Sequence, residues 1–366
     1  MNHGRTERLI DQARAKFRLD LSDLVVYTEA ATGYFSLTPI IAALSGAKKV
    51  IALGADSKYG SFLEAKRTIQ ELARIYGCER RIRIAKEKRK EEVSEADIVT
   101  NLGFVRPIDK TMIGWMKPTA CIPLMWEPWE YREQDIDLNE CVKKGIVVLG
   151  TDESSTLLRT FDFVGILAVK LLLELDIEIL MSSILVVGGG IFAGATVETL
   201  KRLGANVGWL SMAEYGSRPK ASCVDRKTPF WIDITPECNN FIRSADAIVI
   251  VEHQERGELF GLQGKCSFGD LARINRGIAI AHICGTVDEN ELRDSGLNYI
   301  PNEIRKGGYM SVSTAYVGPR PLIDLHTAGL RVGELLARAR LDGKDIDEAK
   351  RVAITQGPGK DFKSTL

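Results

Sequence analysis

Residues 184–211 read ILVVGGGIFAGATVETLKRLGANVGWLS, and this stretch decides the fold. Four β-forming residues precede three glycines, a helical pattern follows, and NVGWLS (residues 206–211) supplies a second strand. Gly188, Gly190 and Ala193 occupy the three small-residue places of the G-x-G-x-x-G/A fingerprint. The order of strand, glycine loop, helix and strand predicts a nucleotide-binding β-α-β unit.

Each small residue of this loop has a physical role in holding a dinucleotide. Gly188 permits the tight turn, Gly190 lets a pyrophosphate approach the backbone, and Ala193 lets the helix pack closely on its strand. The first helical turn, which includes Ile191 and Phe192, directs backbone N–H groups toward the phosphates. We therefore expect a bound nicotinamide dinucleotide, and the alternative is a glycine turn without a ligand.

The choice between NAD and NADP depends on the end of the second strand. An NAD site normally has Asp or Glu there for the ribose 2′-hydroxyl, but this chain has Ser211. The next loop contains Arg218 and Lys220, and either cation could pair with a 2′-phosphate. Glu214 is the counterargument, because a small shift of the loop would supply the missing carboxylate. NADP is therefore the favoured cofactor and NAD the alternative.

The bulk composition excludes several classes of function. The 366 residues are 45% hydrophobic and 27% charged, which suits two domains with separate cores. Lys plus Arg and Asp plus Glu both total 49, so no net charge attracts nucleic acid or an anionic membrane. No run reaches the roughly 18 apolar residues of a membrane span, and the cysteines lack metal-ligand spacing. We expect a cytoplasmic protein that acts on a small molecule without a metal.

Residues 23–57 form a second β-α-β pattern, in which a glycine-containing loop and an apolar helix separate two strands. The loop ATGYFSL, with the later Asp56, superficially resembles the first motif of S-adenosylmethionine methyltransferases, but it lacks the full glycine pattern. We therefore interpret this loop as part of the α/β architecture and not as a second cofactor site. The charge run RIAKEKRKEE (residues 83–92) mixes both signs, and is interpreted as a solvated helix face.

The alternation of strands and helices predicts an α/β protein with two Rossmann-like domains. Each is expected to be a doubly wound, mainly parallel sheet, with a cleft between the domains. The substrate domain should span residues 1–160 and be completed by 320–366, and the dinucleotide-binding domain should span 161–319. The apolar run 160–180 predicts a helix that crosses between them, and the tail beyond Asp342 is expected to be partly loose.

The order of segments resembles the D-2-hydroxyacid dehydrogenase superfamily. ADIVTNLGFVRPIDKTMI (residues 96–113) and DIDLNECVKKGIVVLGTDESSTL (135–157) are similar to the end of that family's substrate domain. SADAIVIVEH (244–253) and INRGIAIAHICGTVDENEL (274–292) are similar to strands of its cofactor domain. The resemblance implies an NAD(P)-dependent oxidoreductase for a small polar hydroxy/oxo or amino/imino substrate. It also implies a homodimer that pairs through the cofactor domain.

The resemblance implies a catalytic histidine just before the last long helix, and LHTAGLRVGE places His326 there. The acid that orients this histidine comes earlier in the family, where Glu303 is the nearest candidate. A histidine of near-neutral pKa takes the hydroxyl proton as hydride leaves, and a carboxylate fixes its tautomer. The alternative is that His326 only caps a helix.

The arginine that binds substrate in the family is missing, because Cys284 stands in its place. Cys284 would then line the cofactor site. Arg320 is the candidate replacement for the cation, and Arg159 and Arg132 are alternatives. The departure leaves room for a tightly bound prosthetic dinucleotide, as in proteins similar to adenosylhomocysteine hydrolase. It also leaves room for a dinucleotide sensor without catalysis.

Further candidates follow the ends of predicted strands, where parallel sheets line their ligand crevices. We expect His282 to contact the cofactor and His253 the substrate, with satisfied structural histidines as the alternative. In MWEPWEYRE, a pocket for a cationic or aromatic substrate could be shaped by Trp126, Glu127, Trp129 and Glu130. The alternative for this segment is a loop that packs between domains.

Overall fold

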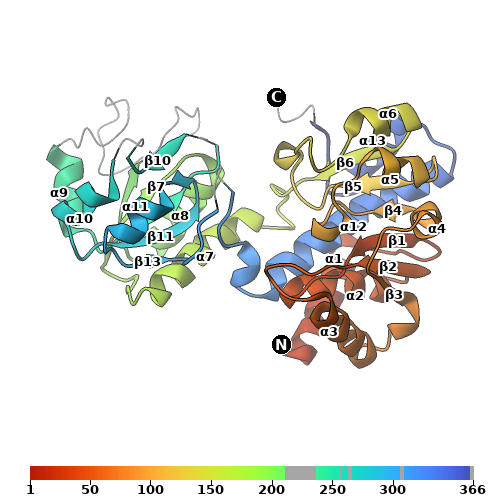
Figure 1. The fold of residues 1–366 in the computed structure, drawn as a ribbon, viewed down its shortest axis with the longest axis horizontal. Coiled ribbons are helices and arrows are strands. Elements are labelled where there is room, and N and C mark those ends of the chain that lie inside the picture. The colour runs from red at the N-terminus through yellow and green to blue at the C-terminus, as the bar shows by residue number, and fades with distance from the viewer. Residues whose placement is uncertain (211–235, 255–256, 263–265, 306–308, 363–366) are drawn as a thin grey trace. The chain divides into compact units, whose positions relative to one another are not determined.

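The computed structural model divides into two compact units. Unit 1 comprises residues 1–159 and 318–366, and unit 2 comprises residues 160–317. The structure describes the chain except for residues 211–235, 255–256, 263–265, 306–308 and 363–366 (Figure 1). Within the described part, no helix combines the length and the apolar character that a membrane crossing requires.

Unit 1 contains a seven-stranded sheet with the order β14-β6-β5-β4-β1-β2-β3, in which only β14 is antiparallel. Its strands are β1 (Val25–Glu29), β2 (Lys49–Leu53), β3 (Ile82–Ala85), β4 (Ile98–Val99), β5 (Cys121–Pro123), β6 (Val147–Thr151) and β14 (Gly359–Lys360). The chain runs from β1 to β3 on one side and then crosses to β4 on the other side of β1. The topological switch point therefore lies between β1 and β4.

Helices cover both faces of this sheet. One face packs against α1 (His3–Phe17), α2 (Leu37–Leu44), α3 (Phe62–Ile75), α12 (Pro319–Leu341) and α13 (Ile346–Gln356). The other packs against α4 (Lys90–Glu95), α5 (Lys110–Trp115) and α6 (Leu138–Lys144). Successive residues of β1, such as Val26 and Tyr27, alternate between these two cores. The C-terminal helices, blue in Figure 1, thus complete a unit that the first 159 residues begin.

Short 3-10 helices follow several strands of unit 1 and position the candidate residues. They are η1 (Gly33–Ser36), η2 (Glu79–Arg81), η3 (Gly103–Val105) and η4 (Pro128–Glu130). Of these, η1, η3 and η4 lie after the carboxyl ends of β1, β4 and β5. The polar residues of these connections therefore gather at one edge of the sheet.

Unit 2 contains a parallel five-stranded sheet with the order β13-β11-β9-β7-β8. Its strands are β7 (Ser183–Val187), β8 (Asn206–Leu210), β9 (Ala247–Val251), β11 (Ala279–Cys284) and β13 (Tyr299–Ile300), and β10 (Glu258–Phe260) pairs separately with β12 (Thr286–Val287). The described helices are α7 (Thr160–Glu174), α8 (Gly190–Arg202), α9 (Pro236–Ser244), α10 (Phe268–Ile274), α11 (Glu289–Asp294) and the 3-10 helix η5 (Thr314–Tyr316). The predicted α/β class with two doubly wound, mainly parallel sheets is confirmed.

The expectation of a solvated helix over residues 83–92 is wrong for its first part. β3 occupies Ile82–Ala85, and α4 begins only at Lys90. Ile82 and Ile84 alternate with Arg83, which is the period of a strand rather than of a helix. The isoleucines pack against the core on the α3 side of the sheet. The burial of one face of this segment therefore determined its structure more strongly than its pattern of charges.

The expectation of a partly loose tail beyond Asp342 is also wrong for the described residues. α13 begins with a capping box, in which Asp345 and Glu348 each bind the other's backbone N–H. Ala349 and Ala353 on this helix are fully buried. β14 then pairs with β6 at the edge of the sheet. The D-x-x-E spacing was the sequence signal for this helix.

Candidate functional site

The glycine loop of unit 2 lies at the switch point of its sheet, between β7 and β9. Gly188 has φ 149° and Gly190 has φ 66°, and residues other than glycine rarely adopt these backbone angles. A Cβ on Gly188 would overlap the carbonyl oxygen of Val251 at the end of β9. Position 188 therefore requires glycine because two strand ends meet there.

The residues after β9 lie directly against this loop. A Cβ on Gly190 would lie 2.7 Å from His253 Cε1 and 2.9 Å from Gln254 Oε1. The His253 ring stacks on Phe192 in the first turn of α8, with 4.3 Å between ring centroids and 19° between planes. His253, which we expected to contact the substrate, is thus part of the wall around the predicted cofactor loop.

The first turn of α8 presents backbone donors that an anion could use. No described side chain caps this helix, whose first N–H groups have no partner within the helix. Phe192 and Ala193 are buried, whereas Ile191 is 48% exposed. The indole Nε1–H of Trp209 in β8 donates to the carbonyl oxygen of Gly188 at 2.9 Å. Sequence reasoning missed Trp209, which holds the first glycine from the neighbouring strand.

His282 is a fully buried residue of β11 whose two ring nitrogens are both engaged within unit 2. Nε2 lies 2.8 Å from the carbonyl oxygen of Gly285, and Nδ1 lies 3.0 Å from the hydroxyl of Ser311. Because a carbonyl only accepts, Nε2 carries the proton and Nδ1 accepts from Ser311. Burial lowers the pKa of His282 to about 4. This arrangement supports the structural alternative over a contact through nitrogen to the cofactor. Cys284, also buried, ends the same strand.

The residues on which the NADP preference depends lie outside the described part of the chain. They are Ser211 and Arg218, together with Glu214 and Lys220. The choice between NAD and NADP therefore stays a sequence prediction.

His326 lies inside α12 and is buried in unit 1. Its Nδ1 is 2.7 Å from Thr38 Oγ1, and its ring meets Phe35 edge-on with 5.8 Å between centroids. Burial lowers the pKa of His326 to about 3, so the ring is neutral at pH 7. His326 is not at a helix end, which excludes the helix-cap alternative.

The predicted partners of His326 are distributed over both units. Arg320 is the second residue of α12, which begins at Pro319, so the last long helix starts before His326 and not after it as predicted. Its Nη2 donates to Gln12 Oε1 at 3.2 Å, and the helical period places it about 120° around the helix from His326. Glu303 is exposed and belongs to unit 2. The pairing of Glu303 with His326 therefore stays a prediction.

The alternative cations lie elsewhere in unit 1. Arg132 follows η4, where its charge opposes the rise in the pKa of Glu130. Arg159 ends the first segment of the unit and has a φ of 53°.

The segment MWEPWEYRE folds against the ends of β6 and β14. Glu127 is 1% exposed and accepts the backbone N–H of Glu153 at 2.9 Å and the Nζ of Lys360 at 3.1 Å. Burial raises the pKa of Glu127, and Lys360 opposes this rise. Glu127 is therefore held by unit 1 itself, while Trp129 remains 39% exposed.

Two further carboxyl groups interact with Glu127: Glu130, which the sequence placed in the same candidate pocket, and Glu153, which sequence reasoning did not single out. Burial raises the pKa of Glu130 to about 7, with Glu127 adding to the rise. Burial, followed by the charges of Glu130 and Glu127, raises the pKa of Glu153 well above its usual range. The side chains of Glu130 and Glu153 also hydrogen-bond to each other. This pair can retain or release a proton near neutral pH.

Arg106, which follows η3, is a cation that sequence reasoning missed. Its guanidinium carbon lies 5.2 Å from the centroid of the Trp126 ring. Its Nη1 also lies 2.7 Å from Asp135 Oδ2. Trp126 thus already holds a cation of its own chain, so that ring face is not open to a cationic ligand.

Glu29 ends β1 beside the switch point of unit 1 and is buried. Its carboxyl group accepts backbone hydrogen bonds from Phe104 and Gly103, which fixes the position of η3. Burial raises the pKa of Glu29 to about 7, although these bonds and Arg106 oppose the rise. An acidic residue at the end of an otherwise apolar strand was the available sequence signal.

Comparisons with known proteins give structural matches only. No family model matches the chain, and no curated protein matches its sequence. A dipicolinate synthase from Bacillus subtilis is similar, with a TM-score of 0.50, 12% identity, and coverage of 89% of this chain and 98% of that chain.

D-lactate dehydrogenase with NAD⁺ from Lactobacillus jensenii gives a TM-score of 0.48 at 11% identity, over 88% of this chain and 98% of that chain. A dipicolinate synthase from Bacillus halodurans gives 0.46 at 12%, over 88% and 99%. At 12% identity, the likeness to the dipicolinate synthase from Bacillus subtilis establishes the fold alone. The chain has the two-domain α/β fold that its resemblance to the D-2-hydroxyacid dehydrogenases predicted.

Proposed function

We propose that this chain is an oxidoreductase that uses a nicotinamide dinucleotide, NADP in preference to NAD. The observation that carries the proposal is the loop from Gly188 to Ala193 in unit 2. Glycine is required at position 188, because a Cβ there would overlap the carbonyl oxygen of Val251. The loop continues into the first turn of α8, which no described side chain caps. These features fit the pyrophosphate of a dinucleotide. When bound, the nicotinamide would accept or donate the hydride.

In this proposal unit 1 supplies the groups that handle the proton. His326 is the predicted acid/base, and its neutral ring suits a hydrogen bond to a substrate hydroxyl or carbonyl. A pKa of about 3 nevertheless makes an isolated imidazole a weak proton acceptor at pH 7. The Glu130–Glu153 pair is the second candidate, because the pKa of Glu130 is about 7. A small polar hydroxy/oxo or amino/imino compound remains the proposed substrate.

The first test is a titration of the purified chain with NADPH, NADH, NADP and NAD, followed by tryptophan fluorescence. We expect micromolar binding, tightest for the NADP pair. Gly190→Ala should weaken binding at least tenfold, because Gly190 has φ 66° and lies against His253 and Gln254. Gly194→Ala is the matched control, because a Cβ there meets nothing within 4 Å. Its affinity should equal that of the wild type.

The outcomes separate the alternatives. Absence of binding by all four nucleotides, in protein that is folded by circular dichroism, would overturn the proposal. Nucleotide that stays with the protein through gel filtration would favour a prosthetic role, as in enzymes similar to adenosylhomocysteine hydrolase. Binding without turnover of any hydroxy, oxo, amino or imino acid would favour a dinucleotide sensor.

A further inference from the structure

Thr38 is a fully buried residue near the start of α2, and its hydroxyl group meets the ring of His326 in α12. Its Oγ1 lies 2.7 Å from Nδ1 of His326 and 3.3 Å from the carbonyl oxygen of Phe35. A hydroxyl has one proton to donate and can also accept. The carbonyl only accepts, whereas Nδ1 either donates or accepts. The direction of the hydroxyl proton therefore decides which ring nitrogen of His326 is protonated.

The carbonyl of Phe35 is the expected acceptor of the hydroxyl proton, because its helical partner is missing. The 3-10 helix η1 runs directly into α2, so the next helical bond to Phe35 would come from the N–H of residue 39. Residue 39 is proline, which has no N–H. If Thr38 donates to Phe35, its Oγ1 can accept from Nδ1–H of His326, and both bonds form. If Thr38 donates to Nδ1 instead, only one of the two bonds forms, which is less favourable in a buried place.

The other ring nitrogen of His326 is left for a ligand. Nε2 has no hydrogen-bond partner among the described residues, and it is not fully enclosed by the protein. The edge-on contact with Phe35 holds the ring in place. Burial lowers the pKa of His326, and no charged group in the described part of the chain contributes to that shift. A neutral hydroxyl, and not a carboxylate of unit 1, therefore holds this ring.

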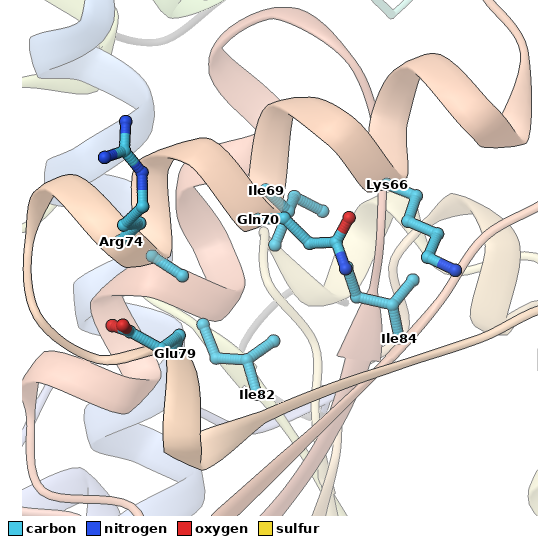
Figure 2. A pocket seen from close by; sticks show the side chains of 8 residues that line it. Lys66, Ile69, Gln70, Arg74, Glu79, Ile82 and Ile84 are labelled. Atoms are coloured by element: carbon cyan, nitrogen blue, oxygen red, sulfur yellow. The ribbon is translucent and has the colours of Figure 1, made fainter.

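The groove of about 430 Å³ between α3 and β3 is a different feature of unit 1 (Figure 2). Its walls include Lys66 and Gln70 of α3 and Ile82 and Ile84 of β3. His326 does not line it. A ligand of Nε2 would therefore bind outside this groove.

We propose that Thr38 is the positioning residue of His326, and that it holds the ring with the proton on Nδ1 and the lone pair of Nε2 free for the substrate. This role rests on the proposed function and narrows its substrate. Nε2 in this tautomer can only accept, so the form of the substrate that it binds carries a hydroxyl or amino group and not an oxo group. The family resemblance gives the orienting role to Glu303. Because Thr38 already occupies Nδ1, the geometry assigns that role to Thr38.

The test is the tautomer of His326 in the full chain at pH 7 without nucleotide. Long-range proton–nitrogen NMR of protein with isotope-labelled histidine measures it directly. The chain has only four histidines, and the signals that disappear in His326→Gln belong to His326. Nε2 couples to both carbon-bound ring protons, whereas Nδ1 couples to one of them. The spectrum therefore shows which nitrogen is protonated, and we expect the proton on Nδ1.

Three variants test the part that the hydroxyl plays. Thr38→Val keeps the shape of the side chain without the hydroxyl, so the proton should move to Nε2, the position that a free histidine side chain favours. Thr38→Ser retains the hydroxyl and should keep the wild-type tautomer. Thr151→Val is the matched control, because Thr151 is also fully buried and donates to a carbonyl, that of Leu124, at 2.7 Å. It should leave the His326 signals unchanged.

The outcomes separate Thr38 from the carboxylate. A wild type with the proton on Nε2 overturns the proposal without any variant, as does a Thr38→Val protein that keeps the proton on Nδ1. A tautomer that changes in Thr38→Ser or Thr151→Val also overturns it. Glu303→Gln should leave the tautomer unchanged, and a change would return the orienting role to Glu303. Because nucleotide is absent from these spectra, the assignment of Thr38 can fail while nucleotide binding stands, and the reverse.

Discussion

Trp209 is the residue whose role can be tested most directly. Its indole Nε1–H is the donor to the Gly188 carbonyl, and the side chain is buried. Trp209→Phe keeps most of the ring but removes this donor, leaving a buried carbonyl without that bond. A lost hydrogen bond of this kind costs about 1 kcal/mol, so we expect nucleotide affinity to fall about fivefold.

The measurement is isothermal titration calorimetry with the nucleotide that the wild type binds best. Trp115→Phe, in α5 of unit 1, is the control because Trp115 is remote in sequence from the glycine loop and belongs to the other unit. Equal affinities for Trp209→Phe and the wild type would mean that the loop keeps its shape without the indole. A drop in both variants would point to a general loss of folded protein.

Single residues show where sequence reasoning succeeds and where it stops. Gly188 was identified from spacing because only glycine suits that turn, and its steric surroundings agree. The sequence left two interpretations of His282 open, because its ring nitrogens are hydrogen-bonded to Gly285 and to Ser311, which come from later parts of the chain. Trp209 and Arg106 were missed for the same reason, because their partners are fixed by the tertiary fold.

At the scale of elements, β14 contacts the group of buried carboxyl residues around Glu127 through one side chain. Lys360 Nζ lies 3.0 Å from Glu127 Oε2 and 3.3 Å from Asp152 Oδ1. Lys360→Met removes the countercharge of a buried carboxylate, which typically costs about 3 kcal/mol. Because the pKa of Glu127 is already raised, the carboxyl group can take up a proton at low pH. We therefore expect a larger loss of stability at pH 8 than at pH 5.

Urea unfolding at the two pH values measures this difference. Lys350→Met is the matched control, because Lys350 pairs with Asp361 at 3.5 Å and both side chains are partly exposed. Exposed pairs contribute at most about 1 kcal/mol, so this variant should lose little at either pH. A Lys360→Met deficit that does not change with pH would show that Glu127 keeps its charge without the lysine.

Elements also differ in how far the sequence predicts them. The strand–loop–helix order of β7 and α8 was predicted because a local pattern and a local turn specify it. β3 was mistaken for a helix because its charges concealed a strand period of only four residues. α13 and β14 were overlooked because a short helix after a polar turn gives a weak hydrophobic signal, although Asp345 and Glu348 cap it. Burial against α12 stabilises α13, whose formation the local sequence predicts only weakly.

At the scale of the whole molecule, the buried titratable groups are divided unevenly between the units. In unit 1, burial raises the pKa of the carboxyl groups of Glu29, Glu130 and Glu153. In unit 2, His282 is the described group with a lowered pKa, at about 4. Each unit has its own core, so calorimetry is expected to resolve two transitions.

The two transitions should respond to pH in opposite senses. A carboxyl group with a raised pKa favours the folded state while it is protonated, so its contribution is lost as pH rises through the folded pKa. As pH rises from about 4.5 to 7, the unit 1 transition should therefore move to lower temperature, because three such carboxyl groups outweigh the opposite effect of His326, whose pKa is lowered to about 3. A histidine with a lowered pKa favours the unfolded state as it becomes protonated there. Between pH 6.5 and 4.5 the unit 2 transition should therefore fall.

Variants assign each shift to its group. Glu153→Gln cannot ionise, so it should reduce the stability that unit 1 loses as pH rises and leave unit 2 unchanged. His282→Gln removes the titrating ring while it retains a side-chain donor for Gly285, so the acid loss of unit 2 should diminish. One transition that shifts as a whole in wild type and variants alike would contradict this division. Such a result would mean that the two units unfold together in one transition. The buried titratable groups of both units would then affect the temperature of that single transition.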